Sequence, residues 1–310
     1  MAGVLDNVDM RTRLAGNNRL ELLLFRMGGK QRYGINVFKV REVLECPPLR
    51  RVPTAHPGIR GVATVRGRTI PVIDLGRVLG MRGVEGHAGQ FVVITEFNRS
   101  VQGFLVGGVD RIVNMNWEEI LPPPSNSGRG SYLTAVTRMD DELIEILDVE
   151  KVLAEVAPKQ LDISAEVAAA QSASASYKPV LVVDDSSTAR KMIARTLDQV
   201  GIKYFMATNG REALEMLKQW AAGTEPLTQQ IGLVVSDIEM PEMDGYTLTT
   251  EIKKHPQLRE LFVMLHSSLS GVFNDSMVKK VGADRFLAKF NSDDFARLML
   301  EIMQQTRDKN

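Results

Sequence analysis

The sequence predicts two folded domains of different class, an all-β domain followed by an α/β domain. The chain has 310 residues, which exceeds the usual size of a single domain. Between Pro158 and Lys178 the apolar periodicity fades into small and polar residues, which is typical of a linker. Closely spaced strand-like runs precede this segment, whereas strand-like and helical runs alternate after it. We therefore expect a first domain at residues 18–156, a linker at 157–177 and a second domain at 178–308.

In the first domain, short turns separate pairs of strand-like runs, as in successive hairpins. The turns are Gly28-Gly29, Arg66-Gly67 and residues 98–100. The runs beside them are residues 20–27 and 31–37, 62–65 and 68–74, and 91–97 and 101–106. Short helical patterns fit only residues 38–44, 75–79 and 149–156. These helices are too few to cover both faces of a large sheet, so a compact β-barrel-like domain is expected.

In the second domain, apolar runs that look like buried strands alternate with helical stretches. The strand-like runs are residues 180–183, 204–207, 232–236, 262–266 and 285–288. The first helix is expected to begin near Ser187 and to stop at Gly201. The second helix has Asn209 as its N-cap with Glu212 three residues later, which is a capping box. The alternation predicts an open, doubly wound, five-stranded parallel sheet.

Composition and charge exclude several classes of protein. The 38 Lys and Arg residues balance the 38 Asp and Glu residues, which argues against a protein that mainly grips nucleic acid or an anionic membrane. The single cysteine, Cys46, excludes an internal disulfide and a multi-cysteine metal site. No apolar run is long enough to cross a membrane, and the N-terminus lacks the apolar core of a signal peptide. We expect a cytoplasmic protein without membrane insertion and without a nucleic-acid partner.

Polar residues stand where the predicted strands of the second domain end: Asp184, Asp185, Asp237, Ser267 and Lys289. The carboxyl ends of the strands form the ligand site in such sheets, so these side chains should converge. Three carboxylates in one cleft repel one another, and Mg²⁺ suits them because it also keeps positions for water and a phosphate oxygen. Asp237 would then be the nucleophile of a phosphoryl transfer, while Lys289 and a hydroxyl group would neutralise the phosphate oxygens.

Three strings in this domain identify a family. They are Val-Leu-Val-Val-Asp-Asp-Ser-Ser from Val180, Val-Val-Ser-Asp-Ile-Glu-Met-Pro-Glu-Met-Asp-Gly from Val234 and Phe-Leu-Ala-Lys from Phe286. With them the whole second domain resembles the receiver domains of two-component response regulators. An alternative reading of residues 237–245 as a calcium loop fails, because Pro241 and the spacing of the carboxylates do not fit one.

The resemblance to receiver domains implies a role for each residue of the predicted site. Asp237 is implied to be the phosphoacceptor. Ser267 is implied to close on the phosphoryl group and Lys289 to contact it, while Phe286 changes rotamer with the closure. The implied ligands of Mg²⁺ are the carboxylates of Asp184, Asp185 and Asp237 and the backbone carbonyl of Glu239.

Two positions leave the site partly open. The family usually has a proline after the lysine, where a cis peptide shapes the loop, but Phe290 follows Lys289 here. A cis bond before a residue other than proline costs several kcal/mol more, so this loop is expected to differ. Ser267 is followed by Ser268, so a shift of one residue would pass the hydroxyl role to Ser268.

The first domain contains strings of another family. They are Tyr-Gly-Ile-Asn-Val-Phe-Lys-Val-Arg-Glu-Val from Tyr33, Gly-Val-Ala-Thr-Val-Arg-Gly-Arg-Thr-Ile-Pro-Val-Ile-Asp-Leu-Gly from Gly61 and Tyr-Leu-Thr-Ala-Val from Tyr132. They resemble the CheW family of chemotaxis coupling proteins. That resemblance implies two small β-barrels that join chemoreceptors to a histidine kinase. Arg66, in an Arg-Gly turn, and Glu42, in a Val-x-Glu helix, are the implied contact positions.

A coupling domain followed by a receiver domain resembles the CheV family. We expect a cytoplasmic scaffold at the receptor array, which couples chemoreceptors to a CheA-type histidine kinase and is regulated by phosphorylation of Asp237. Apart from phosphoryl uptake and loss at this residue, no enzymatic activity is expected. In an alternative, the receiver only drains phosphoryl groups from the kinase. A transcription factor or a phosphorylation-gated enzyme is disfavoured, because the first domain lacks a basic recognition helix and catalytic groups.

Overall fold

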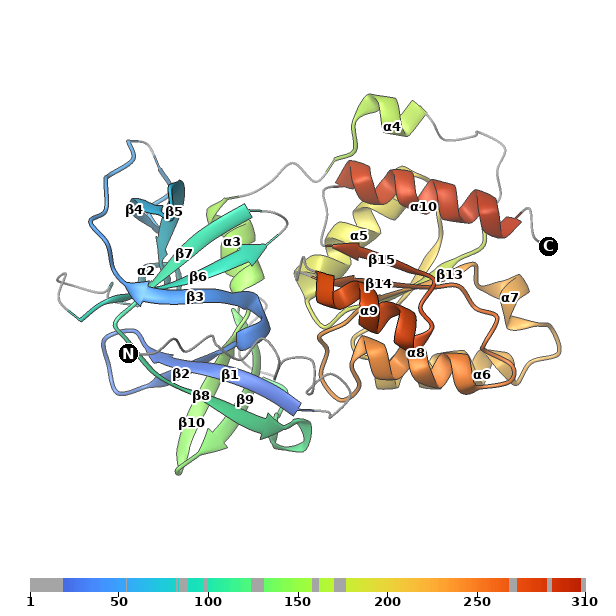
Figure 1. Cartoon of the computed structure of the whole chain (residues 1–310), viewed down its shortest axis with the longest axis horizontal. Helices are drawn as coiled ribbons and strands as arrows, with labels where there is room; N and C mark the ends of the chain where they lie inside the picture. Colours follow the sequence, from blue (N-terminus) through green and yellow to red (C-terminus); the bar gives the residue numbers. More distant parts are fainter. Residues whose placement is uncertain are drawn as a thin grey trace. The chain divides into compact units, whose positions relative to one another are not determined.

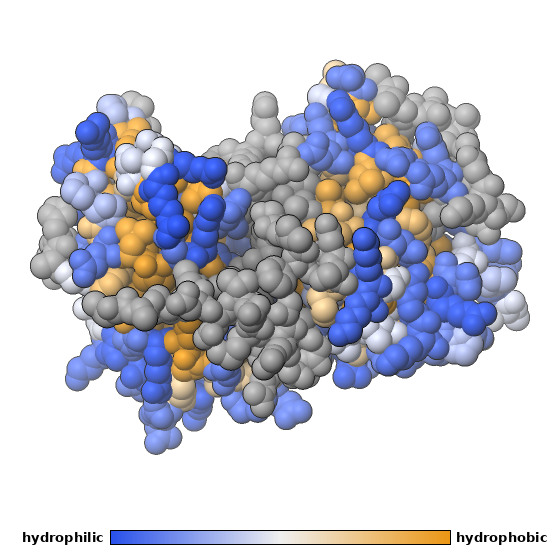
Figure 2. Space-filling view, viewed as in Figure 1, coloured by the Kyte–Doolittle hydropathy of each residue, from blue (hydrophilic) through white to orange (hydrophobic). Residues whose placement is uncertain are grey.

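The computed structural model describes residues 19–53, 55–81, 83, 89–97, 100–123, 131–157, 162–169, 177–267, 272–288 and 292–307. These residues form two compact units, one that ends at Ala157 and one that begins at Asp162. Strands dominate the first unit, whereas helices flank a sheet in the second (Figure 1). On the face that Figure 2 shows, both units expose hydrophilic as well as hydrophobic residues. Within the described ranges, no helix has the length and apolar character needed to cross a membrane.

The first unit is built from two five-stranded sheets. The first sheet has the order β8-β1-β2-β10-β9, and the second has the order β3-β6-β7-β5-β4. Neighbouring strands are antiparallel except for the parallel pairs β2/β10 and β5/β7. The strands are β1 (Arg19–Arg26), β2 (Arg32–Asn36), β3 (Val40–Glu45), β4 (Ile59–Val65), β5 (Arg68–Asp74), β6 (Phe91–Phe97), β7 (Ser100–Val106), β8 (Gly108–Asn116), β9 (Leu133–Met139) and β10 (Glu142–Leu147).

Strand β1 shows why its sequence reads as a continuous apolar run. Leu22 and Leu24 face a core within the strand's own sheet. Leu23 and Phe25 face a second core, to which the other sheet also contributes side chains. All four side chains are at most 3% exposed. A strand that is buried on both faces loses the alternation of apolar and polar residues, so the two sheets together account for this pattern.

The helix predicted at residues 38–44 is wrong. A single 3-10 turn, Val37–Lys39, leads directly into β3, which pairs with β6 along its length. The β-branched side chain of Val40 is buried in the shared core, and such pairing commonly overrides a weak helical pattern. The other two predicted helices are present as α2 (Leu75–Val78) and α3 (Val149–Val156).

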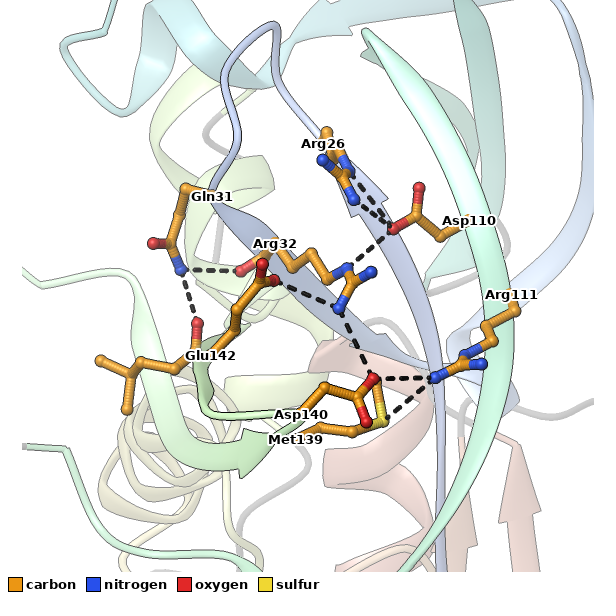
Figure 3. Close-up of polar contacts among 9 residues, drawn as sticks. Arg26, Gln31, Arg32, Asp110, Arg111, Met139, Asp140 and Glu142 are labelled. Atoms are coloured by element: carbon orange, nitrogen blue, oxygen red, sulfur yellow. Dashed lines mark hydrogen bonds and ion pairs between the residues drawn. The ribbon is translucent and has the colours of Figure 1, made fainter.

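Ion pairs connect the two edge strands of the first sheet (Figure 3). Arg111 on the edge strand β8 lies 3.3 Å from Asp140, in the turn that follows the opposite edge strand β9. Arg32 on β2 lies between them and contacts Asp110 at 3.0 Å and Glu142 at 3.1 Å. A single exposed pair contributes less than about 1 kcal/mol. As a network, these pairs favour a sheet that curls until its edges meet.

The second unit contains one parallel sheet with the strand order β12-β11-β13-β14-β15. Its strands are β11 (Val180–Val183), β12 (Tyr204–Ala207), β13 (Leu233–Asp237), β14 (Val263–Ser267) and β15 (Arg285–Ala288). Its helices are α5 (Ser187–Gln199), α6 (Gly210–Ala221), α7 (Leu227–Gln230), α8 (Gly245–Lys254), α9 (Val272–Val281) and α10 (Ser292–Arg307). The predicted doubly wound, five-stranded sheet is confirmed.

Helices cover both faces of this sheet. In β11, every side chain is fully buried. Val180 and Val182 pack with α5 and α10, whereas Leu181 and Val183 pack with α6 and α8. Burial on both faces leaves only the strand ends available for polar chemistry.

The predicted capping residues define the ends of α5 and α6. Asn209 accepts a hydrogen bond from the backbone N–H of Glu212 at 2.8 Å, and the Glu212 carboxylate accepts one from the backbone N–H of Thr208 at 2.7 Å. Helix α5 begins at Ser187, and Gly201 follows it with a positive φ of 70°, a conformation that favours glycine.

A short helix in the segment predicted as linker belongs to the second unit. Helix α4 (Ala165–Ala169) packs beside α10, and its Val167 is 1% exposed within the core formed by α5 and α10. The backbone N–H of Ser164 donates to Asp293 at 2.7 Å. Asp162 contacts Arg195 at 2.7 Å. Apolar burial and polar contacts therefore attach residues 162–169 to the receiver fold.

Val167→Ala is expected to lower the free energy of unfolding of the second unit by about 2 kcal/mol, because a buried valine loses most of its packing. Glu166→Ala, which changes an exposed residue on the same helix, should stay within about 0.5 kcal/mol of the wild type. Urea denaturation of the full chain, with hydrogen exchange of the amides in α5 and α10 as the readout for the second unit, measures the change in unfolding free energy for both variants. Equal stability of Val167→Ala and the wild type would contradict the attachment.

Candidate functional site

Three neighbouring strands bring predicted site residues together at the carboxyl edge of the second sheet. Asp184 follows β11, Asp237 ends β13 and Ser267 ends β14. Strand β13 lies between β11 and β14. All three residues are at most 3% exposed. The fold thus assembles two buried carboxylates and a hydroxyl group from residues that lie far apart in the sequence.

Local hydrogen bonds orient Asp184. One carboxylate oxygen, Oδ1, accepts a hydrogen bond from the backbone N–H of Ser186 at 2.8 Å. The guanidinium group of Arg190, on α5, donates to the backbone carbonyl of Asp184. The other carboxylate oxygen, Oδ2, lies 3.6 Å from the imidazole of His266. Asp185 comes next in the chain but is only half-buried.

The loop after Asp237 folds back tightly against it. The backbone N–H of Gly245, the first residue of α8, donates to the carbonyl of Ile238 at 2.9 Å. A Cβ atom at Gly245 would lie 2.2 Å from the backbone oxygen of Asp237, so only glycine fits here. Asp244 caps α8 by accepting from the backbone N–H of Thr247 at 2.7 Å. The glycine and the cap fix the loop between Asp237 and α8.

His266 is the residue of this site that the sequence did not reveal. It is paired in register with Asp237, and its side chain is 1% exposed. Its Nδ1 lies 3.9 Å from Asp237 Oδ1, while its Nε2 faces Asp184. One possible ligand atom from each of the three residues lies within 4.8 Å of the others. The position of a histidine at the end of a buried strand, directly before the predicted hydroxyl residue, is the only signal that could have indicated it.

Ser267 and Phe286 lie on the neighbouring strands β14 and β15. The Ser267 hydroxyl is 3.4 Å from Oε1 of Glu239, a long hydrogen bond. Phe286, on β15, is half-buried against a cluster that contains Ile238 and Tyr246. Burial raises the pKa of Tyr246, and the negative charges of Glu239 and Asp244 add to this effect, so the phenol stays neutral. Ser267 thus contacts Glu239, whereas Phe286 packs in an apolar cluster that includes Leu265 of the neighbouring strand β14.

Other residues of the predicted site lie outside the described part of the chain. They are Lys289, the neighbouring Phe290, and Ser268, the alternative to Ser267.

The buried residues fit a divalent cation. Asp184 and Asp237 are both almost fully buried, and two carboxylates cannot both stay ionised in one dry group without compensating positive charge. Carboxylate oxygens are the ligands that hard divalent ions such as Mg²⁺ prefer. The arrangement can therefore hold an ion next to the Asp237 carboxylate.

In the first unit, the two predicted contact residues form an ion pair. Arg66 donates through Nε at 3.1 Å and Nη2 at 2.8 Å to one carboxylate oxygen of Glu42. Arg66 has a positive φ of 47° in the turn between β4 and β5, and Gly67 follows with a φ of 77°. Because Glu42 lies on β3, the pair joins the two edges of the second sheet. Glu42 is on a strand, and its predicted helical setting is corrected accordingly.

Known proteins match both units. Residues 21–157 match the CheW-like domain, and residues 180–301 match the response regulator receiver domain. Chemotaxis protein CheV3 of Helicobacter pylori is 32% identical over 306 residues, which cover 94% of this chain and 96% of CheV3. The chain belongs to the CheV family. Chemotaxis protein CheV1 of the same organism is 30% identical over 325 residues, which cover 98% of this chain and 99% of CheV1.

The first unit also resembles proteins that consist mainly of the coupling module. Chemotaxis protein CheW of Klebsiella aerogenes is 30% identical over 135 residues, which cover 43% of this chain and 81% of that protein. As a member of the CheV family, this protein is a chemotaxis coupling adaptor with a receiver domain. The resemblances to the CheW and receiver families that were seen in the sequence are confirmed.

Proposed function

We propose that this CheV-family adaptor couples chemoreceptors to a CheA-type histidine kinase and that phosphorylation of Asp237 regulates this coupling. The observation that carries the proposal is the burial of Asp237 beside Asp184 and Ser267 at the carboxyl edge of the receiver sheet. A buried carboxylate in a group that fits a divalent ion suits a phosphoacceptor. The adaptor acts in the cytoplasm at the receptor array. Its own chemistry is confined to uptake and loss of a phosphoryl group.

The transfer is an in-line displacement. A carboxylate oxygen of Asp237 attacks the phosphorus atom of a phosphohistidine on the kinase. The new O–P bond forms as the P–N bond breaks, and the imidazole, which already carries a proton on its other nitrogen, leaves as a neutral ring. Lys289 would contact the transferred phosphoryl group.

The residues of this site would also bind Mg²⁺. The ligands would be the carboxylates of Asp184, Asp185 and Asp237 and the backbone carbonyl of Glu239. When bound, the ion neutralises charge on the phosphoryl oxygens. The hydrogen bond from the Ser186 N–H to Asp184 Oδ1 supports this arrangement, because it orients one carboxylate of the set.

The signal would leave the site through Ser267. Its hydroxyl donates to Oε1 of Glu239 over 3.4 Å. A hydrogen bond of this length is weak. A phosphoryl group on Asp237 offers three strong acceptors, so Ser267 would turn towards it and release Glu239. Phe286, which packs on the same side of the sheet near Leu265, would then change rotamer and alter the receiver surface.

Incubation of the full chain with Mg²⁺ and acetyl phosphate is expected to add one phosphoryl group, seen by intact mass, because Asp237 is the nucleophile. Asp237→Asn should abolish the adduct, since an amide cannot attack. Asp198→Asn, which changes an exposed acid of the same unit, should keep it. Chelation of the metal should suppress the adduct in both reactive proteins. An equal adduct on Asp237→Asn would assign the chemistry to another carboxylate.

Arg66 and Glu42 are proposed to contact the kinase or a receptor. Arg66→Glu alone should disrupt coupling, because it places two carboxylates face to face. The exchange Glu42→Arg with Arg66→Glu restores an ion pair across the sheet edges. If these residues contact a partner, the exchange should still reduce partner binding by about tenfold or more. The matched control is the exchange of Arg41 and Glu96, which pair at 3.0 Å between β3 and β6. Full recovery of binding by the Glu42 and Arg66 exchange would mean that the pair only closes the sheet.

A further inference from the structure

His266 brings a nitrogen donor into the acidic group of the receiver. The ring is 1% exposed and lies between two carboxylates, with Nε2 at 3.6 Å from Asp184 Oδ2 and Nδ1 at 3.9 Å from Asp237 Oδ1. Asp184 is 0% exposed and Asp237 is 3% exposed, so both acids are also buried. Asp185, the other acid of the predicted ligand set, is only half-buried and stands outside this group of three.

The chemistry of the donors bears on which cation they bind. Oxygen ligands suit Mg²⁺, which dehydrates reluctantly and rarely takes nitrogen. Imidazole suits first-row divalent ions, and a mixed set of two carboxylates and one imidazole suits an ion that accepts both oxygen and nitrogen. Mn²⁺ meets this condition, because it binds oxygen ligands in six-coordinate sites as Mg²⁺ does and, as a first-row transition ion, accepts an imidazole more readily than Mg²⁺. A group with His266 in it therefore differs in preference from an all-oxygen pocket.

The distances are close to those of a coordination sphere. Ligands at roughly 2.1 Å from an ion lie about 3 Å apart when adjacent and about 4 Å apart when opposite. The ring offers one nitrogen to an ion: Nε2 lies 3.6 Å from Asp184 Oδ2, and Nδ1 lies 3.9 Å from Asp237 Oδ1. One ligand atom from each of the three residues lies within 4.8 Å of the others. Movements of less than about 1 Å by these side chains would complete the sphere.

We propose that His266 is a ligand of the receiver's cation, together with Asp184 and Asp237, and that it makes the site prefer Mn²⁺ over Mg²⁺. This inference rests on the proposed function, since it concerns the cation that the same pocket holds. Because β14 pairs with β13 in register, the backbone presents the ring to Asp237 without any rearrangement of the sheet. The His266 side chain thus acts as a selector of the metal.

The test is pulsed electron paramagnetic resonance of Mn²⁺ bound to the full chain. Coordination by His266 predicts modulation from a directly bound nitrogen, which changes when the protein is labelled with ¹⁵N-histidine. His266→Val should remove the modulation, whereas His255→Gln, which changes a half-exposed histidine at the end of α8, should keep it. In competition titrations, His266→Val should weaken Mn²⁺ binding by about tenfold and change Mg²⁺ binding by less than about threefold.

The outcomes separate this inference from the proposed function. Bound Mn²⁺ without nitrogen modulation in the wild type would overturn the role of His266 and leave the carboxylate pocket intact. The labelled wild-type spectrum decides this even if His266→Val does not fold. Failure of the wild type to bind either ion would overturn the cation pocket itself.

Discussion

The burial of Asp184 and Asp237 around one imidazole is the constraint on which the second unit depends. Two carboxylates in a dry group cost several kcal/mol unless positive charge or hydrogen bonds compensate them. Strands such as β11 are fully buried on both faces. Polar groups are therefore placed at the carboxyl ends of the strands, where the two carboxylates meet. A bound cation would relieve this repulsion, and it would also offset the further negative charge that the proposed phosphorylation adds to Asp237.

The first unit satisfies a different constraint, which is the closure of two small sheets. In each sheet an arginine on or beside one edge strand contacts an acid on or beside the other, Arg111 with Asp140 and Arg66 with Glu42. The Arg66 side chain is 79% exposed and that of Glu42 is 16% exposed, so their pair contributes little stability on its own. Exposed charge in a fixed turn is instead available for recognition, which links the closure of this sheet to its proposed role in coupling.

Sequence reasoning found the parts whose signals are local. The buried strands, the capping residues Asn209 and Glu212 and the acids at the strand ends all follow from short patterns. His266 was not predicted as a site residue, because a histidine on a buried strand is expected to be part of the core. Only the pairing of β13 with β14 places it beside Asp237. The helix predicted around Glu42 failed because the partner strand β6 lies about fifty residues away in the sequence. Val167 is the only sizeable apolar side chain of helix α4, and the core in which it is buried is formed by strands and helices that follow it in the chain.

Kinase activity in receptor arrays reconstituted with the full-length adaptor tests the central claim most directly. The wild-type protein and Asp237→Asn are compared before and after a phosphodonor is added. We predict that phosphorylation changes the receptor-controlled kinase activity with the wild type and leaves it unchanged with Asp237→Asn. Equal kinase activity with both proteins, together with faster loss of phosphoryl groups from the kinase with the wild type alone, would contradict regulation of coupling and identify the receiver as a phosphate sink.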